Sequence, residues 1–197
     1  MTKKNRNIGL LILFLLLALV AIIVFTYREK TFNIVELGKE NAVLNRTDKP
    51  YLDTIVSVGL SELGIAGITV LIDPLEKELI TGEFEIQAHI IGTQNQFIIF
   101  TNEFSREKAL EVMSHELIHL QQYNTGRLIK TNGGVIWEGY YIQSIDQIPY
   151  LARPWELEAF VLGENLERTL KVILIIKILM ILLLKICGHL YMNSIFH

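Results

Sequence analysis

The segment Ser114–Leu120, with the sequence SHELIHL, decides how the rest of the chain is interpreted. Its two histidines, His115 and His119, stand four residues apart, so on a helix both imidazoles project from one face, one turn apart. Two imidazoles in this arrangement can bind one zinc ion at about 2.0–2.1 Å. Glu116 would then face the open side of the metal, where it can take a proton from zinc-bound water. The segment therefore predicts a zinc site with Glu116 as a general base.

The flanking residues predict the helix that this arrangement needs. Ser105 is a favoured N-cap residue, and Glu107 lies in the first turn, where its charge complements the helix dipole. Gly126 follows Tyr123 as a stop signal. We therefore expect a helix from Ser105 to about Tyr123. The alternative is that the two histidines are surface or core-edge residues of an ordinary amphipathic helix.

The remaining pattern predicts an α+β domain in which helices enclose a small sheet. Helical spacing marks residues 51–63 and 153–166, and runs rich in β-branched residues mark the strands. The expected strands are 68–72, a hairpin of 84–91 with 96–100, and a second hairpin of 128–130 with 135–137.

The strand 96–100 leads directly into the motif helix. In zincins, which the H-E-x-x-H segment resembles, such a strand commonly borders the cleft and pairs with an extended peptide, so the resemblance implies the same role here. An interior strand with no free edge is the alternative.

A catalytic zinc ion takes three protein ligands and keeps one position for water, so a third ligand must come from elsewhere in the chain. His89 lies on a predicted strand, and His189 and His197 lie in the apolar C-terminal tract, so none is well placed. The later helix supplies two carboxylates, Glu156 and Glu158. They point about 200° apart around a helix, so only one of them can face the metal.

The two motifs resemble those of the gluzincins, whose H-E-x-x-H is completed by a glutamate on a later helix, often followed three residues on by alanine. Glu156 and Ala159 match that spacing, and the CAAX-processing membrane peptidases and the ImmA/IrrE-type peptidases end their sites in a similar way. The segments 137–139 (WEG) and 153–156 (RPWE) are also similar to those of small bacterial and phage zincin-like domains.

This resemblance covers about residues 50–167 and implies a minimal zincin-like metallopeptidase domain. It implies Glu156 as the third zinc ligand beside His115 and His119, with Glu158 as the alternative ligand. Several gluzincins carry an aspartate directly after the alanine, where it orients the metal-bound histidines. Phe160 stands at that position here, so this sequence departs from the pattern at the residue that would orient the histidines.

Hydrolysis through a tetrahedral intermediate also needs a hydrogen-bond donor beside the oxyanion, and gluzincins often use a tyrosine or a histidine for this. Tyr140, Tyr141 and Tyr150 lie between the two motifs, and Arg153 lies close to Glu156 in sequence. These four residues are the candidate transition-state stabilisers. The alternative for each is a packed aromatic ring or a helix-flanking ion pair.

The formal net charge of −3 hides three unlike regions. Residues 31–167 carry a net charge of −11, whereas residues 1–30 and 168–197 carry +4 each. The acidic region is the predicted metallopeptidase domain, and the two basic ends are strongly apolar. This distribution gives no basic surface for nucleic acid, and Cys187, as the single cysteine, excludes a disulfide scaffold.

The first end, residues 1–30, is predicted to be a cytoplasmic tip followed by a transmembrane signal-anchor. Residues 8–27 are uncharged and almost entirely aliphatic, which is long enough to cross a bilayer as a helix. Three basic residues precede this stretch, so the catalytic domain is expected on the extracytoplasmic side, in a bacterial periplasm or at the cell exterior. A cleaved signal peptide and a buried core helix are the alternatives.

The second end, residues 168–197, is predicted to be an apolar helix with one narrow basic stripe. Lys171, Lys185 and His189 fall within about 40° of one another around a helix. Such a stripe suits a helix that lies on anionic lipid. A second transmembrane crossing would place Lys177 mid-membrane at a cost of about 2.5–3.5 kcal/mol, and an aberrant terminus is a third alternative.

Together these observations predict a membrane-anchored zinc metallopeptidase of gluzincin type that acts on peptide or protein substrates. A second hypothesis is a non-catalytic zincin-like domain that keeps the metal as a membrane-tethered sensor or partner-binding module. A third is a small membrane adaptor in which the motif is accidental. The sequence does not specify the substrate or the oligomeric state.

Overall fold

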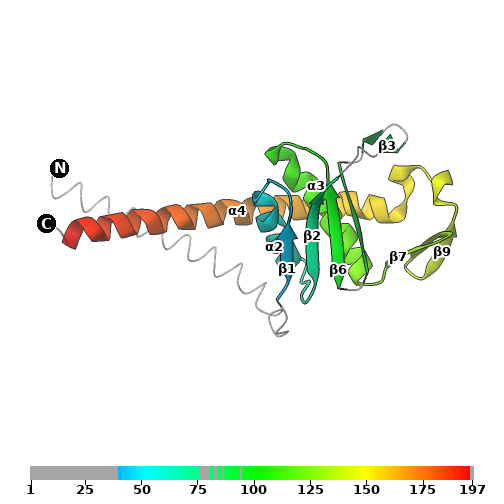
Figure 1. The fold of residues 1–197 in the computed structure, drawn as a ribbon, viewed down its shortest axis with the longest axis horizontal. Helices are drawn as coiled ribbons and strands as arrows, with labels where there is room; N and C mark the ends of the chain where they lie inside the picture. The colour runs from blue at the N-terminus through cyan, green and yellow to red at the C-terminus, as the bar shows by residue number, and fades with distance from the viewer. Residues whose placement is uncertain (1–39, 76–79, 82–83, 86, 94, 196–197) are drawn as a thin grey trace. The chain divides into compact units, whose positions relative to one another are not determined.

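The computed structural model describes residues 40–75, 80–81, 84–85, 87–93 and 95–195. Within them lies an α+β unit built on a four-stranded mixed sheet (Figure 1). The strands are β1 (Ala42–Asn45), β2 (Thr69–Pro74), β5 (Ala88–Thr93) and β6 (Gln96–Thr101), arranged in the order β1-β2-β6-β5. The first three in this order run parallel, and β5 runs antiparallel to β6.

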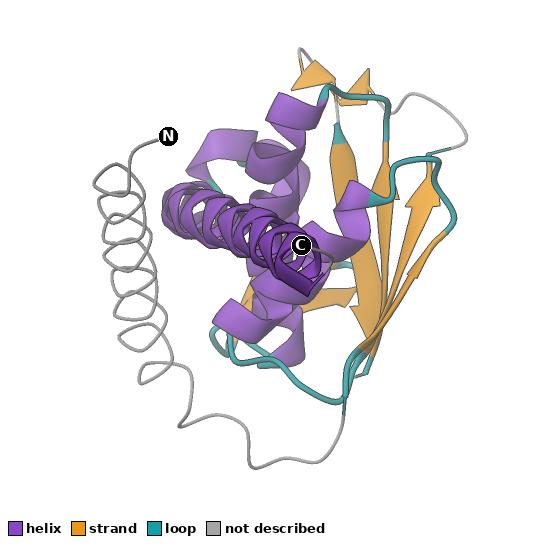
Figure 2. Ribbon diagram, turned by 90° about the vertical axis from the view of Figure 1, so that its left-hand side faces the viewer, coloured by secondary structure: helices purple, strands orange, loops and turns teal. Residues whose placement is uncertain are grey.

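Helices α2 (Tyr51–Glu62) and α3 (Arg106–Asn124) pack on one face of this sheet and on each other (Figure 2). Val70 and Ile72 of β2 and Phe97 and Ile99 of β6 are buried beneath them, whereas the alternate residues of these strands are only partly buried. The prediction that helices enclose the sheet is therefore wrong. Alternating burial is typical of a sheet that packs its core on one side.

A close approach between α2 and α3 fixes the position of the motif helix. Gly59 of α2 faces Leu117, and a Cβ atom at position 59 would collide with the Cδ1 atom of that leucine. Leu117 itself is fully buried, between the two histidines of the motif. The apolar side of the motif helix is thus held in the core, which turns its opposite side toward the later part of the chain.

The start of α3 follows the sequence prediction. Ser105 caps the helix, with its hydroxyl oxygen accepting a hydrogen bond from the backbone N–H of Lys108 at 3.3 Å. Glu107 lies in the first turn, and Gly126 adopts a positive φ of 69° just after the helix ends. These local signals are confirmed because each depends only on residues within one turn of the helix end.

A second, three-stranded antiparallel sheet follows α3. It comprises β7 (Leu128–Thr131), β8 (Gly134–Trp137) and β9 (Tyr140–Gln143) in sequence order. The hairpin of β7 and β8 was predicted, but β9 was not. Glu138 and Gly139 both have positive φ, as in the two-residue turn of a tight hairpin. The short strands β3 (Ile80–Thr81) and β4 (Phe84–Glu85) form a separate pair.

Two short 3-10 turns, η1 (Ile145–Gln147) and η2 (Tyr150–Ala152), lead into a single long helix, α4 (Pro154–Ile195). The sequence suggested a helix over 153–166 and a distinct apolar helix beyond 168. The structure joins them because no proline interrupts the chain between them and Gly163 alone does not break a helix. The part of α4 up to Lys171 belongs to the compact unit Leu37–Lys171, and Val172–Ile195 belongs to a different unit.

Among the residues that the structure describes, no helix combines the length and the apolar character needed to cross a membrane. The predicted signal-anchor at residues 8–27 lies outside the described residues.

Candidate metal centre

Three side chains from α3 and α4 bring their ligand atoms to one point. The Nε2 atoms of His115 and His119 lie 3.1 Å apart. The Oε2 atom of Glu156 lies 3.0 Å from Nε2 of His119 and 3.4 Å from Nε2 of His115. The sequence motif and the glutamate of the later helix, 37 residues from His119, thus meet in one His-His-Glu group that could hold a metal ion.

The spacing of these atoms fits a tetrahedral metal site. Bonds of about 2.0–2.1 Å at tetrahedral angles place neighbouring ligand atoms about 3.3–3.4 Å apart, within a few tenths of an ångström of the separations found here. The group is also largely buried, with side-chain exposures of 15% for His115, 8% for His119 and 10% for Glu156. Two imidazole nitrogens and a carboxylate oxygen repel one another unless protons or a cation lie between them, so the geometry is consistent with a zincin-like site.

Glu116 lies beside this group and is itself buried, with 5% of its surface exposed. Its Oε2 atom has no hydrogen-bond partner among the described residues. Burial raises the pKa of this carboxyl group, although the neighbouring His119 and His115 act in the opposite direction. An uncommitted carboxylate with a raised pKa beside a metal-ligand group is the arrangement that a general base requires.

The carboxyl group of Glu156 behaves in the opposite way. Burial alone would raise its pKa, but hydrogen bonds from His115, His119 and Tyr150 hold the pKa well below its usual range. Burial alone would lower the pKa of His119, and its hydrogen bond with Glu156 reverses that effect, so the pKa is raised. The site therefore keeps Glu156 ionised, as a metal ligand must be.

Small residues on α4 allow Glu156 to reach the histidines. Ala159 is fully buried at the crossing with α3. One turn further on, a Cβ atom at Gly163 would lie only 3.2 Å from the Cα atom of His115. Small side chains let two helix backbones approach closely, so the alanine and the glycine together set the depth at which Glu156 enters the site.

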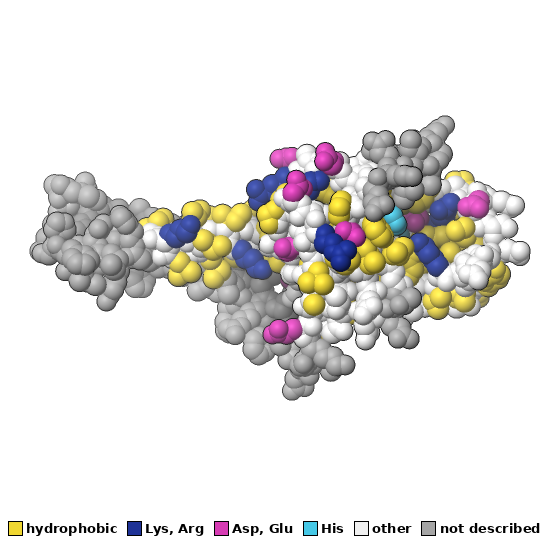
Figure 3. Space-filling model, in the orientation of Figure 1, with side chains coloured by type: hydrophobic (Ala, Val, Ile, Leu, Met, Phe, Trp, Pro, Cys, Tyr) yellow, Lys and Arg dark blue, Asp and Glu magenta, His cyan; other side chains and the backbone are white. Residues whose placement is uncertain are grey.

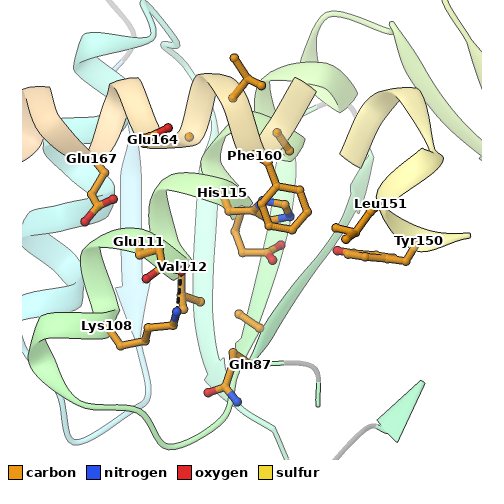
Figure 4. A pocket seen from close by; sticks show the side chains of 15 residues that line it. Gln87, Lys108, Glu111, Val112, His115, Tyr150, Leu151, Phe160, Glu164 and Glu167 are labelled. Atoms are coloured by element: carbon orange, nitrogen blue, oxygen red, sulfur yellow. Dashed lines mark hydrogen bonds and ion pairs between the residues drawn. The ribbon is translucent and has the colours of Figure 1, made fainter. Parts of the chain in front are cut away.

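Phe160 takes part in the site through its ring. Its centroid lies 4.6 Å from that of His115, and the two rings are tilted by 54° (Figure 4). The Nδ1 atom of His115 is buried and has no hydrogen-bond partner in the described part of the chain. The ring therefore packs on this histidine at the position where the gluzincin pattern has a carboxylate.

The candidate transition-state stabilisers separate into two pairs. Tyr150 lines the same small cavity as Glu156, and burial together with the charge of that carboxylate raises the pKa of Tyr150. Arg153 lines the same small cavity as Glu116, His119 and Glu156, and its guanidinium lies over the Tyr150 ring at 5.5 Å.

Tyr140 and Tyr141, by contrast, lie on β9 with exposed fractions of 77% and 55%. Neither lines either of the two cavities that reach the metal-ligand group. The two-residue Glu138-Gly139 turn was the sequence signal that could have assigned both tyrosines to a strand.

Glu158 does not point at the metal-ligand group. Its carboxylate accepts hydrogen bonds from Arg127 at 2.9 and 3.1 Å and from the Nε2 atom of Gln122 at 2.9 Å. Gln122 in turn contacts His119, with 2.8 Å between its Oε1 atom and the Nδ1 atom of the histidine. Sequence reasoning overlooked Gln122, although it follows the two histidines at i+7 and i+3, on their side of the helix.

A groove of about 700 Å³ leads to the site (Figure 4). Ala88, Val112, Leu151 and Phe160 give it an apolar lining near His115. The space-filling view shows histidine surface bordered by hydrophobic side chains on this face (Figure 3). The charged residues Lys108, Glu111, Glu164 and Glu167 also line the groove. A cleft that combines an apolar lining with a few polar groups is typical of a binding site.

The strand that borders this groove is β5. The predicted bordering strand, 96–100, is the interior strand β6, so the alternative of an interior strand without a free edge is the observed one. Within the described residues β5 is an edge strand. The carbonyl oxygen of Gln87, the residue before β5, accepts a hydrogen bond from the backbone N–H of Asn102, and bonding alternates along an antiparallel ladder. The backbone groups of Ala88, Ile90 and Gly92 therefore point away from β6.

Comparison of the chain with protein-family models, with curated proteins and with solved structures gives no match. The function of the site must therefore be argued from its own chemistry.

We predict that the full-length protein binds one zinc ion per chain and that His119→Ala abolishes this binding. His89→Ala is the matched control, because His89 stacks on Phe100 and is not one of the three converging ligands. Elemental analysis after dialysis gives the stoichiometry. Zinc at 100 times its Kd should add about 2.7 kcal/mol of stability, read from thermal unfolding with and without chelator. Equal zinc content in His119→Ala and His89→Ala would contradict the assignment.

Proposed function

We propose that the protein is a zinc-dependent metallopeptidase of gluzincin type. The observation that carries the proposal is the convergence of His115, His119 and Glu156. Beside them lies a carboxylate oxygen of Glu116 that no other described residue hydrogen-bonds. Two histidines and a glutamate are the ligand set of several zinc peptidases, and nitrogen and oxygen donors in this number suit zinc. Zinc bound there would supply Lewis acidity and lower the pKa of a water molecule.

Glu116 is the proton acceptor in this proposal. Its buried carboxylate takes the proton from the attacking water and later transfers it to the departing amine of the cleaved peptide bond. Desolvation raises the pKa of Glu116, which moves its basicity toward the working range of a general base.

Tyr150 is the proposed donor to the oxyanion. Tyr150 lines the groove, and its ring lies edge-on to the ring of Phe160, with 6.3 Å between the two ring centroids. This packing holds the tyrosine beside the metal-ligand group. The high pKa of Tyr150 keeps the hydroxyl protonated, so it can donate a hydrogen bond as negative charge develops on the peptide carbonyl.

The proposed substrate is an extended peptide that pairs with the free edge of β5. The outward backbone groups of Ala88 and Ile90 offer the hydrogen bonds of one more strand, and Ala88 lines the groove together with His115 and Glu116. Main-chain pairing of this kind holds a peptide without depending on its side chains. It would present a backbone carbonyl, the group to be hydrolysed, to the metal centre.

We also propose that the distal part of α4 attaches the protein to a membrane surface. Its apolar residues are largely exposed from Val172 onward, and Lys177 and Lys185 stand among them. An exposed apolar helix that also carries lysines suits the interface of an anionic bilayer. The exposed apolar residues are Val172, Ile175, Ile178, Leu179, Met180, Ile181, Leu182, Leu184 and Ile186.

Glu116→Gln should reduce peptide hydrolysis by at least about a hundredfold, because the amide cannot accept the proton from water. The assay follows new N-termini released from denatured casein by the full-length protein, using mass spectrometry. Zinc content should be unchanged, since Glu116 is not one of the converging ligands.

Glu103→Gln, an exposed glutamate in the loop before α3, serves as the control and should retain activity. If the wild-type protein binds zinc but releases no more peptide than Glu116→Gln, the catalytic proposal fails. A metal-dependent sensor or binding module would then be the better interpretation.

Tyr150→Phe should lower kcat by about 10- to 100-fold with little change in KM, because the lost hydrogen bond acts mainly on the transition state. Tyr141→Phe removes the same atom from an exposed tyrosine and should have no effect. If Tyr150→Phe lost zinc in proportion to its loss of activity, the hydroxyl would instead act by holding Glu156 in place as a metal ligand.

The membrane proposal is tested by placing a fluorophore at Leu179→Cys in a Cys187→Ser background, in full-length protein reconstituted into anionic vesicles. Lipids with a nitroxide near the headgroup should quench it more strongly than lipids with a nitroxide deep in the acyl chains. Glu103→Cys in the same background should not be quenched. Preferential quenching by the deep nitroxide would overturn the surface placement, and absence of quenching would overturn membrane contact.

A further inference from the structure

Gln122 lies at the centre of a buried hydrogen-bond network behind the metal-ligand group. It is 1% exposed, and its side chain makes three contacts. The Oε1 atom lies 2.8 Å from Nδ1 of His119, and the Nε2 atom lies 2.9 Å from both the carbonyl oxygen of Trp155 and the carboxylate of Glu158. The network therefore joins the turn of α3 that carries His119 to the first turn of α4, which carries Glu156.

The partners of Gln122 determine how its amide is oriented. A carbonyl oxygen and a carboxylate can only accept hydrogen bonds, so both must be served by the NH₂ group of the glutamine. The amide oxygen is then the atom left for His119, and an oxygen can only accept. It follows that Nδ1 of His119 donates and carries a proton. In the neutral imidazole, the form that binds a metal ion, the lone pair then lies on Nε2, the atom that faces Glu156 and His115.

Glu158 is held in place from its other side. Arg127 donates to both of its carboxylate oxygens and also to Glu138, at 2.5 Å. The guanidinium also lies over the Trp137 ring, 4.9 Å from its centroid. A planar guanidinium bound to two carboxylates and an aromatic face has little freedom to move. The acceptor that orients the Gln122 amide is therefore itself fixed.

We propose that Gln122 is the positioning residue of the metal centre, which holds His119 in the tautomer and orientation that metal binding requires. Glu158 and Arg127 act through it by fixing its amide. The inference rests on the metal site of the proposed function, and it concerns metal affinity rather than peptide hydrolysis. Phe160 occupies the position at which the gluzincin pattern led us to expect an orienting carboxylate, and Gln122 provides the equivalent restraint from the motif helix itself.

The first test is Gln122→Met in the full-length protein. Methionine is of similar length but accepts no comparable hydrogen bond from His119, so zinc affinity should fall by about 10- to 100-fold, the usual cost of losing the partner of a metal-ligating histidine. Affinity is measured by competition with a chromophoric chelator. Gln121→Met, the same change at the preceding and less buried position, is the matched control and should leave affinity unchanged.

Cobalt binding distinguishes a positioning role for Gln122 from a merely structural one. The absorption bands of Co²⁺ in place of zinc report ligand geometry, so they should shift in Gln122→Met and not in Gln121→Met. If Gln122→Met lowers the thermal stability of the metal-free protein but leaves zinc affinity and the cobalt spectrum unchanged, the residue is structural and the proposal is overturned.

A second pair of variants keeps the test decisive if the methionine variant folds poorly. Gln122→Glu retains an acceptor for His119 but places a second carboxylate beside Glu158, so it should bind zinc more weakly than the wild type. Adding Glu158→Gln supplies a donor opposite the new carboxylate and should restore most of the lost affinity. Failure of Glu158→Gln to improve on Gln122→Glu would contradict the network. Absence of zinc from the wild type would instead refute the proposed function.

Discussion

The structure depends on the convergence of three Lewis-base atoms in a buried position. Nε2 of His115, Nε2 of His119 and Oε2 of Glu156 lie within 3.4 Å of one another, and no two of them can attract each other as bare lone pairs. Such a cluster is stable only with shared protons or a bound cation. Packing must therefore hold the two helices together. Leu117 is buried on one side of α3, and the small residues Ala159 and Gly163 of α4 allow a close approach to its other side.

Each side of α3 thus has a separate role. One side is fixed in the core by the contact of Leu117 with Gly59 of α2. The other presents the site and carries the network of Gln122, which reaches across to α4. The edge strand β5 and the apolar groove lie beside the site rather than within this network. None of Gln122, Arg127 and Glu158, the residues of this network, is among those that line the groove.

The sequence was informative where function depends on neighbours along one helix. The Ser105 cap, the spacing of His115 and His119, and the Glu156–Ala159 pair could all be recognised because each is defined within about one turn. The order of the strands could not, since the parallel pairing of β2 with β6 joins segments that are distant in sequence. The contacts of Gln122 with α4 were likewise hidden, because Trp155 and Glu158 lie more than 30 residues away in sequence.

The ligand pair His119 and Glu156, 37 residues apart, closes a loop that contains the whole three-stranded sheet and both 3-10 turns. A bound ion would then act as a cross-link, since it removes from the unfolded chain the conformations in which the ends of this loop are apart. The entropic part of that stabilisation grows only with the logarithm of loop length. Insertions or deletions among the strands of the enclosed sheet would therefore change this entropic contribution little.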